Sequence, residues 1–132
     1  MELTIDFPGG AKVEAHFENF SILTDQPLGG GGIGSAPTPF MLFLASIATC
    51  AGFYILGFCR SRGLLATDIH VIQRAHRDPE SGLVSEVELE IQVPPDFPLK
   101  YYDSLVRSAN QCAVKKQLEN PPAFKIFTTA AA

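Results

Sequence analysis

Residues 38–59 read TPFMLFLASIATCAGFYILGFC and contain no charged side chain. Thr38 carries the hydroxyl that a helix N-cap needs, and Pro39 suits the first helical position, so a helix is predicted to begin here. Arg60-Ser61-Arg62-Gly63 is predicted to end it. A helix this long and apolar is either the buried central helix of a soluble core or a membrane span. The amphipathic strands predicted around it favour the buried helix.

Three short antiparallel strands are predicted before this helix, over residues 2–6, 12–17 and 20–24. Apolar and polar residues alternate in 12–17, which is typical of a strand. Residues 29–35 formally contain the dinucleotide pattern G-x-G-x-x-G. However, no buried strand precedes the glycines, and no acidic residue follows about 20 positions later to hold a ribose. We therefore predict a flexible crossover here, not a nucleotide site.

Two strands, a helix and a last strand are predicted after the long helix. A strand over 67–77 and a return strand over 86–93 form a hairpin, in which outward glutamates face Arg74. A second helix follows a cap at Asp96, and Asn120-Pro121-Pro122 ends it. Residues 123–128 are predicted to form the last strand. The order βββ–α–ββ–α–β indicates an α+β fold with antiparallel sheet, in a single domain over residues 1–132.

The composition excludes several classes of protein. The chain has 132 residues, a net charge of −4 and no run of Lys or Arg, which disfavours nucleic-acid binding and a polybasic membrane surface. Residues are 46% hydrophobic and only 18% charged, so we expect part of the surface to be buried in a partner, most simply in a homodimer. The acidic N-terminus has no basic region typical of a secretory signal, and we expect a cytoplasmic protein.

Three cysteines, Cys50, Cys59 and Cys112, are too few for a disulfide framework in such a protein. Cys50 and Cys59 are nine residues apart, so at 100° per residue they point to opposite sides of the first helix. Cys112 lies on the second predicted helix and can approach either of them. Because Cys50 has a mainly apolar lining at helical spacing and Cys59 lies at the helix end, we interpret Cys59 as a structural residue.

Cys112 precedes Lys115 and Lys116 by three and four residues, so we expect an ammonium group to reach its sulfur and lower its pKa. A thiolate that attacks a peroxide becomes a sulfenic acid, which a second cysteine converts to a disulfide. Cys50 and Cys112 are therefore the candidate catalytic residues. The histidines, His16, His70 and His76, have no ligand spacing, and neither a metal nor another cofactor is predicted.

The Gly-rich stretch followed by residues 38–50 and then by Cys112-Ala113-Val114-Lys115-Lys116-Gln117-Leu118 resembles the OsmC/Ohr family of osmotically inducible and organic-hydroperoxide-resistance proteins. The resemblance implies an α+β fold in which antiparallel sheets wrap two central helices in an intertwined homodimer. It also implies that Cys50 is the peroxidatic and Cys112 the resolving cysteine. The implied reaction is the reduction of organic or fatty-acid hydroperoxides under oxidative stress, recycled by a dithiol or lipoyl-type reductant without metal, haem or flavin.

Two features depart from the peroxidatic pattern of that family. Its peroxidatic members carry a Glu about ten residues before the first cysteine, where this chain has Phe40. They also use an Arg from the N-terminal strands, whereas the first Arg here is Arg60. An alternative is therefore a non-catalytic protein that binds an apolar or thiol-reactive small molecule on the same scaffold. A membrane-anchored protein is a third and weaker alternative.

Overall fold

The computed structural model describes residues 1–131 and has the predicted α+β fold with antiparallel sheets. It divides into two compact units, one up to Ser46 and one from Ile47 onward. The long helix α1, Pro39–Ser61, belongs to both units. Each unit is described by itself below.

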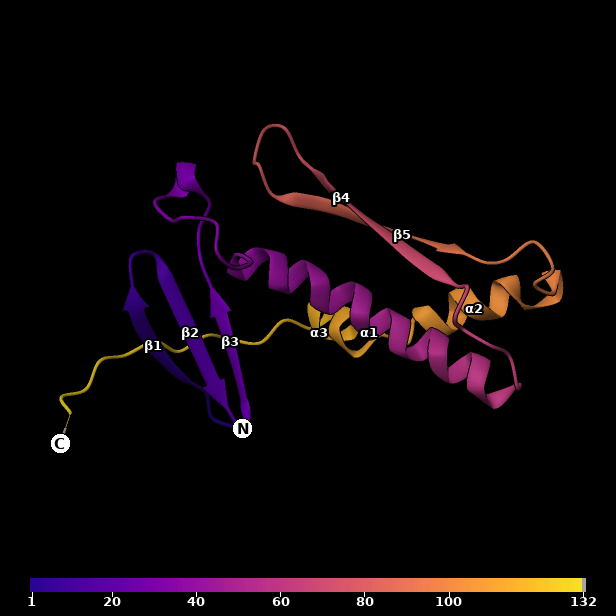
Figure 1. Ribbon diagram of the computed structural model, residues 1–132, viewed down its shortest axis with the longest axis horizontal. Coiled ribbons are helices and arrows are strands. Elements are labelled where there is room, and N and C mark those ends of the chain that lie inside the picture. Colours follow the sequence, from indigo (N-terminus) through magenta and orange to yellow (C-terminus); the bar gives the residue numbers. More distant parts are fainter. Residues whose placement is uncertain (132) are drawn as a thin grey trace. The chain divides into compact units, whose positions relative to one another are not determined.

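The first unit contains a three-stranded antiparallel sheet in the order β1–β2–β3 (Figure 1). The strands are Thr4–Gly9, Lys12–Phe17 and Phe20–Thr24; the last two have the predicted bounds, whereas the first begins and ends later than predicted. β1 extends past its predicted end because a shift in register between Asp6 and Gly9 accommodates Pro8. Apolar side chains such as Phe7 and Phe20 are exposed, so this sheet has little core of its own within one chain.

A buried aspartate organises the connection between β3 and α1. The carboxylate of Asp25 accepts hydrogen bonds from the backbone N–H of Gln26 at 2.8 Å and from the N–H and hydroxyl of Ser35 at 3.0 and 2.6 Å. A Cβ at Gly32 would collide with the carbonyl oxygen of Gln26, so only glycine fits there. The connection is a loop with one short 3₁₀ turn at Leu28–Gly30, as predicted for a crossover, and these contacts join Asp25 to Ser35 within it.

The Asp25 contacts predict a loss of stability in acid. Hydrogen bonds from Ser35, and then from Gln26, hold the pKa of this carboxyl far below its usual range. A lowered pKa in the folded state means that the ionised group stabilises the fold fully above the ordinary Asp pKa of about 3.9, and that this contribution is lost as the pH falls below it. We expect Asp25→Asn to lower the melting temperature at neutral pH. The difference in melting temperature between the variant and the wild type should become smaller in acid. Asp68→Asn, at an exposed site, is the control, and a gap that does not depend on pH would contradict the assignment.

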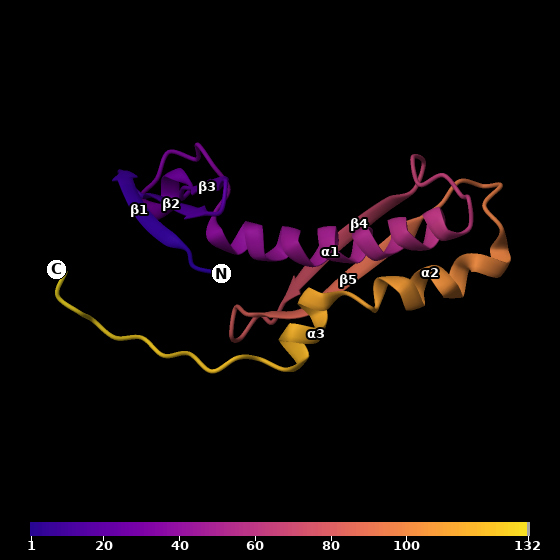
Figure 2. The ribbon, with the colours of Figure 1, turned by 90° about the horizontal axis from the view of Figure 1, so that it is seen from below.

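The second unit contains an antiparallel hairpin of β4, His70–Arg77, and β5, Val84–Gln92. The predicted ion pairs are confirmed, because the Arg74 guanidinium contacts Glu88 and Glu90, each at 2.9 Å. The apolar residues of β5 face the other way. Figures 1 and 2 show this hairpin alongside the C-terminal part of α1 and the helix α2, Tyr102–Ala109.

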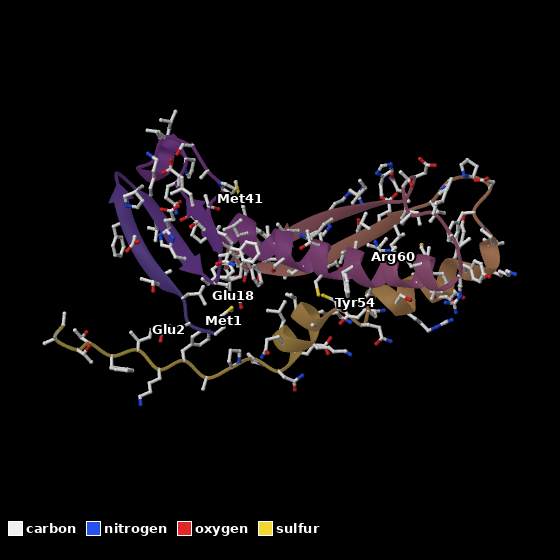
Figure 3. All side chains as sticks on the ribbon, turned by 60° about the horizontal axis from the view of Figure 1, so that its bottom comes forward. Met1, Glu2, Glu18, Met41, Tyr54 and Arg60 are labelled. Atoms are coloured by element: carbon white, nitrogen blue, oxygen red, sulfur yellow. The ribbon has the colours of Figure 1, made fainter. Side chains whose placement is uncertain are left out.

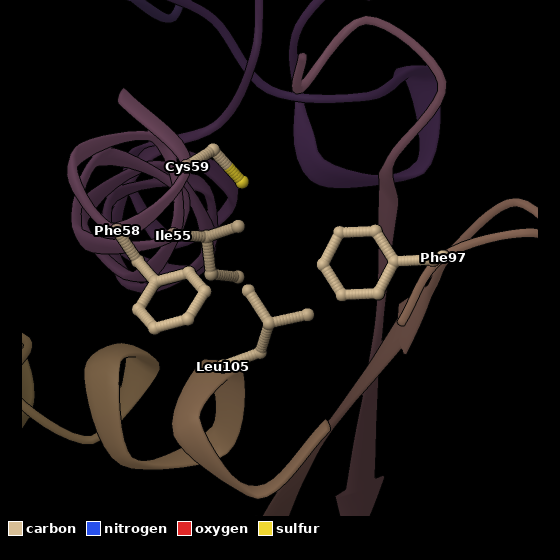
Figure 4. Close-up of a cluster of buried hydrophobic side chains, with 5 residues drawn as sticks. All are labelled: Ile55, Phe58, Cys59, Phe97 and Leu105. Atoms are coloured by element: carbon tan, nitrogen blue, oxygen red, sulfur yellow. The ribbon is translucent and has the colours of Figure 1, made fainter. Parts of the chain in front are cut away.

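The core of the second unit lies between α1, α2 and the hairpin. Its buried side chains come from α1, from the segment before α2 and from α2 itself: Ile55, Phe58, Cys59, Phe97 and Leu105 (Figure 4). Val71 and Ile91 of the hairpin pack against them. This cluster fixes α1 against α2, and with it the separation of the two elements that carry Cys50 and Cys112.

α1 begins as predicted, because the N–H of Met41 donates to the Thr38 hydroxyl at 3.2 Å. Its buried residues recur every three or four positions, so one face is buried while others, such as the face of Phe53, are exposed. The prediction of a buried helix therefore holds for one face only, which in the second unit packs against α2, the hairpin and the segments that adjoin them. By length and composition α1 also resembles a membrane span, as core helices of soluble proteins can.

The second predicted helix is wrong in its extent. No side chain caps it at Asp96; it begins with a 3₁₀ turn at Leu99–Tyr101, and α2 stops at Ala109. Cys112 has non-helical backbone angles, φ −45° and ψ 119°, and a separate short helix, α3, follows at Ala113–Glu119. At Cys112 the backbone leaves the helical conformation. The Cys112 sulfur is the N-cap of α3, because it accepts the backbone N–H of Lys115, which has no acceptor within the helix.

The predicted last strand over residues 123–128 is also wrong. This segment forms no strand and finds no pairing partner in the part of the chain described here. Its apolar side chains, including Phe124 and Ile126, are almost fully exposed. Alternation of residue types is not sufficient for a strand, because backbone N–H and C=O groups also need a neighbouring strand.

Candidate thiol site

Cys50 and Cys112 come together in the second unit. Cys50 is half-buried on α1, and Cys112 is only 2% exposed at the start of α3. The Cys112 thiol lies within hydrogen-bonding reach of the Cys50 sulfur. Neither thiol is in a disulfide.

The surroundings of Cys50 favour its thiolate. The backbone N–H of Val114 makes the main contribution, and the Cys112 thiol and the N–H of Ala113 add to it. These donors lower the pKa of Cys50 even though partial burial opposes ionisation. Of the two thiols, Cys50 is therefore the one whose surroundings favour ionisation.

Cys112 is tuned in the opposite direction. Burial, above all, raises its pKa, and the neighbouring Cys50 adds to the increase. Its thiol donates to the carbonyl oxygen of Ile47 at 3.8 Å, and its sulfur accepts the N–H of Lys115 at 3.4 Å. The protonated form of Cys112 is therefore favoured, and its single S–H has both the Ile47 carbonyl oxygen and the Cys50 sulfur within reach.

The expectation that a lysine ammonium lowers the pKa of Cys112 was wrong, because burial raises that pKa and no ammonium group contributes to it. Lys115 has other partners. Its ammonium contacts the side-chain oxygen of Asn110 at 3.0 Å and Glu119 at 3.4 Å. The helix break at Cys112 is the cause, because the spacing rule for neighbouring side chains holds only within one continuous helix. It is the backbone N–H of Lys115 that reaches the sulfur.

Cys59 takes no part in this pair. It is fully buried in the core cluster of the second unit, and burial raises the pKa of its thiol. Its interpretation as a structural residue agrees with this position.

An apolar cavity of about 360 Å³ lies beside Cys112. Apolar side chains of α1, β5, α2 and α3 line most of it. Besides Cys112, the lining includes two polar residues, Asn110 and Lys115. Cys50 is not among the lining residues, so a molecule in this cavity would contact the pair from the Cys112 side.

The sequence did not reveal the groups that activate Cys50. They are the backbone N–H groups of Ala113 and Val114, which no choice of side chain announces. The one signal in the sequence was the place of Cys112 directly before Ala-Val-Lys-Lys. A small residue with an acceptor atom there can cap a helix that begins at Ala113, and the first N–H groups of such a helix are free to donate.

The sequence also missed a cluster of possible metal ligands on the hairpin. Ligand atoms of His76, Glu86 and Glu88 lie within 4.8 Å of one another across β4 and β5. All three side chains are exposed, and Glu88 already pairs with Arg74. The pairing of β4 with β5 brings these side chains together, although His76 is ten residues from Glu86 in the sequence, a spacing that no short ligand motif has.

We expect Cys50 to be the most reactive thiol at neutral pH. Its lowered pKa predicts that its alkylation by iodoacetamide rises with pH around a midpoint below the ordinary cysteine value of about 8.5. Peptide mapping by mass spectrometry measures the rate at each cysteine. The control is alkylation of the protein unfolded in urea, in which the pH midpoint for the Cys50 peptide should return to the ordinary value. Faster modification of Cys112 than of Cys50 in the folded protein would contradict the assignment.

Fold and site together define an α+β protein with two neighbouring thiols whose pKa values are shifted in opposite directions, that of Cys50 downward beside backbone N–H groups and that of buried Cys112 upward. A family model described as OsmC-like protein matches residues 30–127. The chain belongs to the OsmC-like protein family, and this membership supports a general stress or redox role.

Solved structures agree with this fold. A Psychrobacter arcticus 273-4 protein named for osmotic stress induction and a detoxification response is 24% identical, with a TM-score of 0.73 over 87% of this chain and 85% of that one. An Aquifex aeolicus VF5 protein is 15% identical, with a TM-score of 0.64 over 91% and 87%. An organic hydroperoxide resistance protein OsmC from Legionella pneumophila is 20% identical, with a TM-score of 0.53 over 89% of both chains. No curated protein matches the chain significantly.

Proposed function

We propose that this protein is a thiol-dependent peroxidase that reduces organic hydroperoxides in the response to oxidative stress. The observation that carries the proposal is the opposite tuning of two adjacent thiols, Cys50 toward the thiolate and Cys112 toward the protonated form. Membership of the OsmC-like family supports it, and so does the fold shared with the Legionella protein named for organic hydroperoxide resistance.

The chemistry proceeds in three balanced steps. The Cys50 thiolate attacks the terminal oxygen of the hydroperoxide; the S–O bond forms, the O–O bond breaks, and the alkoxide leaves as an alcohol after it takes up a proton. Cys112 then attacks the Cys50 sulfur, which forms the disulfide and releases the sulfenic oxygen as water. A dithiol or lipoyl-type reductant reduces the disulfide and is itself oxidised to its disulfide.

The protein's own groups assist each step. Backbone N–H groups of α3 keep Cys50 ionised, and the Cys112 thiol is a proton source beside the leaving oxygen. Because Cys112 already contacts Cys50, the disulfide can form without a large movement of α1 or α3. We propose no metal or other cofactor for this reaction.

The test is the consumption of cumene hydroperoxide in the presence of dithiothreitol. We expect turnover by the wild type and equal turnover by Cys59→Ala, since Cys59 belongs to the core cluster and takes no part in the thiol pair. A wild-type protein that is folded, reduced and inert would contradict the peroxidase function.

The cavity beside Cys112 favours a second candidate, a non-catalytic protein that binds an apolar small molecule. Its lining is almost entirely apolar, and Phe40 stands where peroxidatic family members carry a Glu. This function would be supported over the first if the wild type bound cumyl alcohol but did not turn over hydroperoxide. Cys50→Ser should then bind cumyl alcohol with the same affinity as the wild type.

We propose that the protein is a cytoplasmic homodimer. Phe7, Phe20 and Phe53 are among many large apolar side chains that a single chain leaves exposed. We expect sedimentation equilibrium to give twice the chain mass of 14.3 kDa at micromolar concentration. A stable monomer under these conditions would contradict the proposal.

A further inference from the structure

The apolar cavity beside Cys112 adjoins one sulfur of the thiol pair and not the other. Its volume of about 360 Å³ is in the range of small-molecule sites in proteins. α1 contributes Ile47 and Ala51 to its wall. Cys50 lies one helical turn before Tyr54, which Figure 3 labels on α1, and neither of these two side chains lines the cavity. A molecule in the cavity therefore meets the sulfur of Cys112.

The polar residues of the cavity mark its open side. Asn110 and Lys115 are exposed although they belong to the lining, so they lie where the cavity meets the solvent. The Lys115 ammonium contacts Asn110 and also Glu119, whose side chain is 59% exposed. Charged side chains are depleted in the centre of protein interfaces. This side of the cavity is therefore unlike the apolar surface, such as that of Phe53, which we expect a partner chain to bury.

The two sulfurs also differ as leaving groups in thiol–disulfide exchange. In a Cys50–Cys112 disulfide, a thiolate that attacks one sulfur expels the other, and the thiol of lower pKa leaves faster. The backbone N–H of Val114, above all, lowers the pKa of Cys50, whereas burial raises the pKa of Cys112. Expulsion of Cys50 is therefore favoured, and it requires attack at Cys112, the sulfur that adjoins the cavity.

We propose that the cavity beside Cys112 binds the reductant, a small neutral dithiol with an apolar body, and that this dithiol attacks the sulfur of Cys112. The proposal rests on the redox pair of the proposed function. One thiolate of the reductant forms an S–S bond with Cys112, the Cys50–Cys112 bond breaks, and Cys50 leaves as the thiolate. The second thiolate then attacks the reductant sulfur of this mixed disulfide, which closes the reductant's own disulfide and expels Cys112. Two electrons pass from the reductant to the protein; Cys112 takes up one thiol proton, and the other goes to the solvent.

The experiment uses butanethiol and mercaptoethanol, an apolar and a polar monothiol, because their mixed disulfides cannot close on themselves. The full chain is oxidised with diamide, which converts thiol pairs to disulfides without a hydroperoxide, and is then mixed with each thiol. N-Ethylmaleimide stops the reaction early, and peptide mapping by mass spectrometry locates the adducts. We expect the thiol adduct on Cys112 and the maleimide on Cys50. An adduct on Cys50, equal amounts on both cysteines, or no Cys50–Cys112 disulfide after diamide would overturn the proposal.

The rate of disulfide loss tests whether the apolar cavity selects the reductant. Each rate constant is divided by that of the same thiol with glutathione disulfide, which corrects for intrinsic reactivity. This ratio should be larger for butanethiol than for mercaptoethanol by about tenfold, because the cavity buries about two more carbon atoms of butanethiol. Equal ratios would contradict binding in the cavity.

A matched pair of variants on α2 locates the entry. Val106 lines the cavity and is 52% exposed, so Val106→Trp should fill part of the cavity without disturbing the core; the adjacent Arg107 is exposed and does not line the cavity. We expect Val106→Trp to slow reduction by butanethiol about tenfold and Arg107→Trp to leave it unchanged. Both variants should keep the iodoacetamide reactivity of Cys50. Equal reduction rates for Val106→Trp and the wild type would overturn the proposal.

Failure of this proposal is distinguishable from failure of the peroxidase function, because diamide replaces the hydroperoxide. A protein that is inert toward cumene hydroperoxide but forms the Cys112 adduct after diamide would lose the peroxidase function and keep this site. A protein that turns over hydroperoxide but carries the adduct on Cys50 would keep the peroxidase function and lose this site.

Discussion

Replacement of Cys50 by Ser is expected to abolish dithiol-supported reduction of organic hydroperoxides, with a loss of about a thousandfold or more. The serine hydroxyl stays protonated at neutral pH, so the N–H groups of Val114 and Ala113 no longer have a nucleophilic anion to stabilise. Steady-state consumption of cumene hydroperoxide measures the effect. The fold should be unaffected, because Cys50 lies outside the buried core cluster.

Cys112→Ser is the matched control on the second thiol. It should still reduce about one equivalent of hydroperoxide per site quickly, because Cys50 keeps its backbone donors. Later turnovers should be slower, since an external thiol must then replace the resolving cysteine. Equal steady-state rates for wild type and Cys50→Ser would contradict the proposed role of Cys50.

Leu105→Ala is expected to be the most destabilising substitution in the second unit, at about 3 kcal/mol of unfolding free energy. Leu105 is 2% exposed and packs among Ile55, Phe58 and Phe97, where α2 meets α1 (Figure 4). Removal of its side chain leaves a cavity that the two helices and the hairpin cannot fill by a local shift. Equilibrium unfolding in urea at a fixed chain concentration measures the change.

The neighbouring Val106 on α2 supplies the control, because it is 52% exposed. Val106→Ala should change the unfolding free energy by no more than about 0.5 kcal/mol. Similar effects of the two substitutions would show that the core is not where the structure places it. A displaced α2 would also move α3, so Leu105→Ala should reduce the reactivity of Cys50 toward iodoacetamide.

The sequence predicted those parts of the fold in which the residues of an element carry the information themselves. The alternation in β5 predicts its two faces, and Arg74 then meets Glu88 and Glu90 as expected. The cap at Thr38 predicts the start of α1. The family resemblance named Cys50 and Cys112 as partners, and the structure places their thiols in contact.

The parts that failed depend on contacts made elsewhere in the chain. Periodicity continued through Asn110 and Cys112, but there the backbone leaves the helix and the Cys112 thiol reaches the carbonyl of Ile47 on α1. That contact joins residues far apart in sequence, and no local pattern indicates it. The activation of Cys50 by backbone N–H groups follows from the same break, so an error in one helix boundary hid the main electrostatic feature of the site.

Peptide mapping of the reduced protein after one equivalent of cumene hydroperoxide, without added reductant, tests most directly whether Cys50 and Cys112 form a redox pair. The account predicts that the wild type loses two hydrogens and yields a Cys50–Cys112 disulfide, and that Cys112→Ser instead gains one oxygen on Cys50. An unmodified wild type, or a disulfide that includes Cys59, would contradict it.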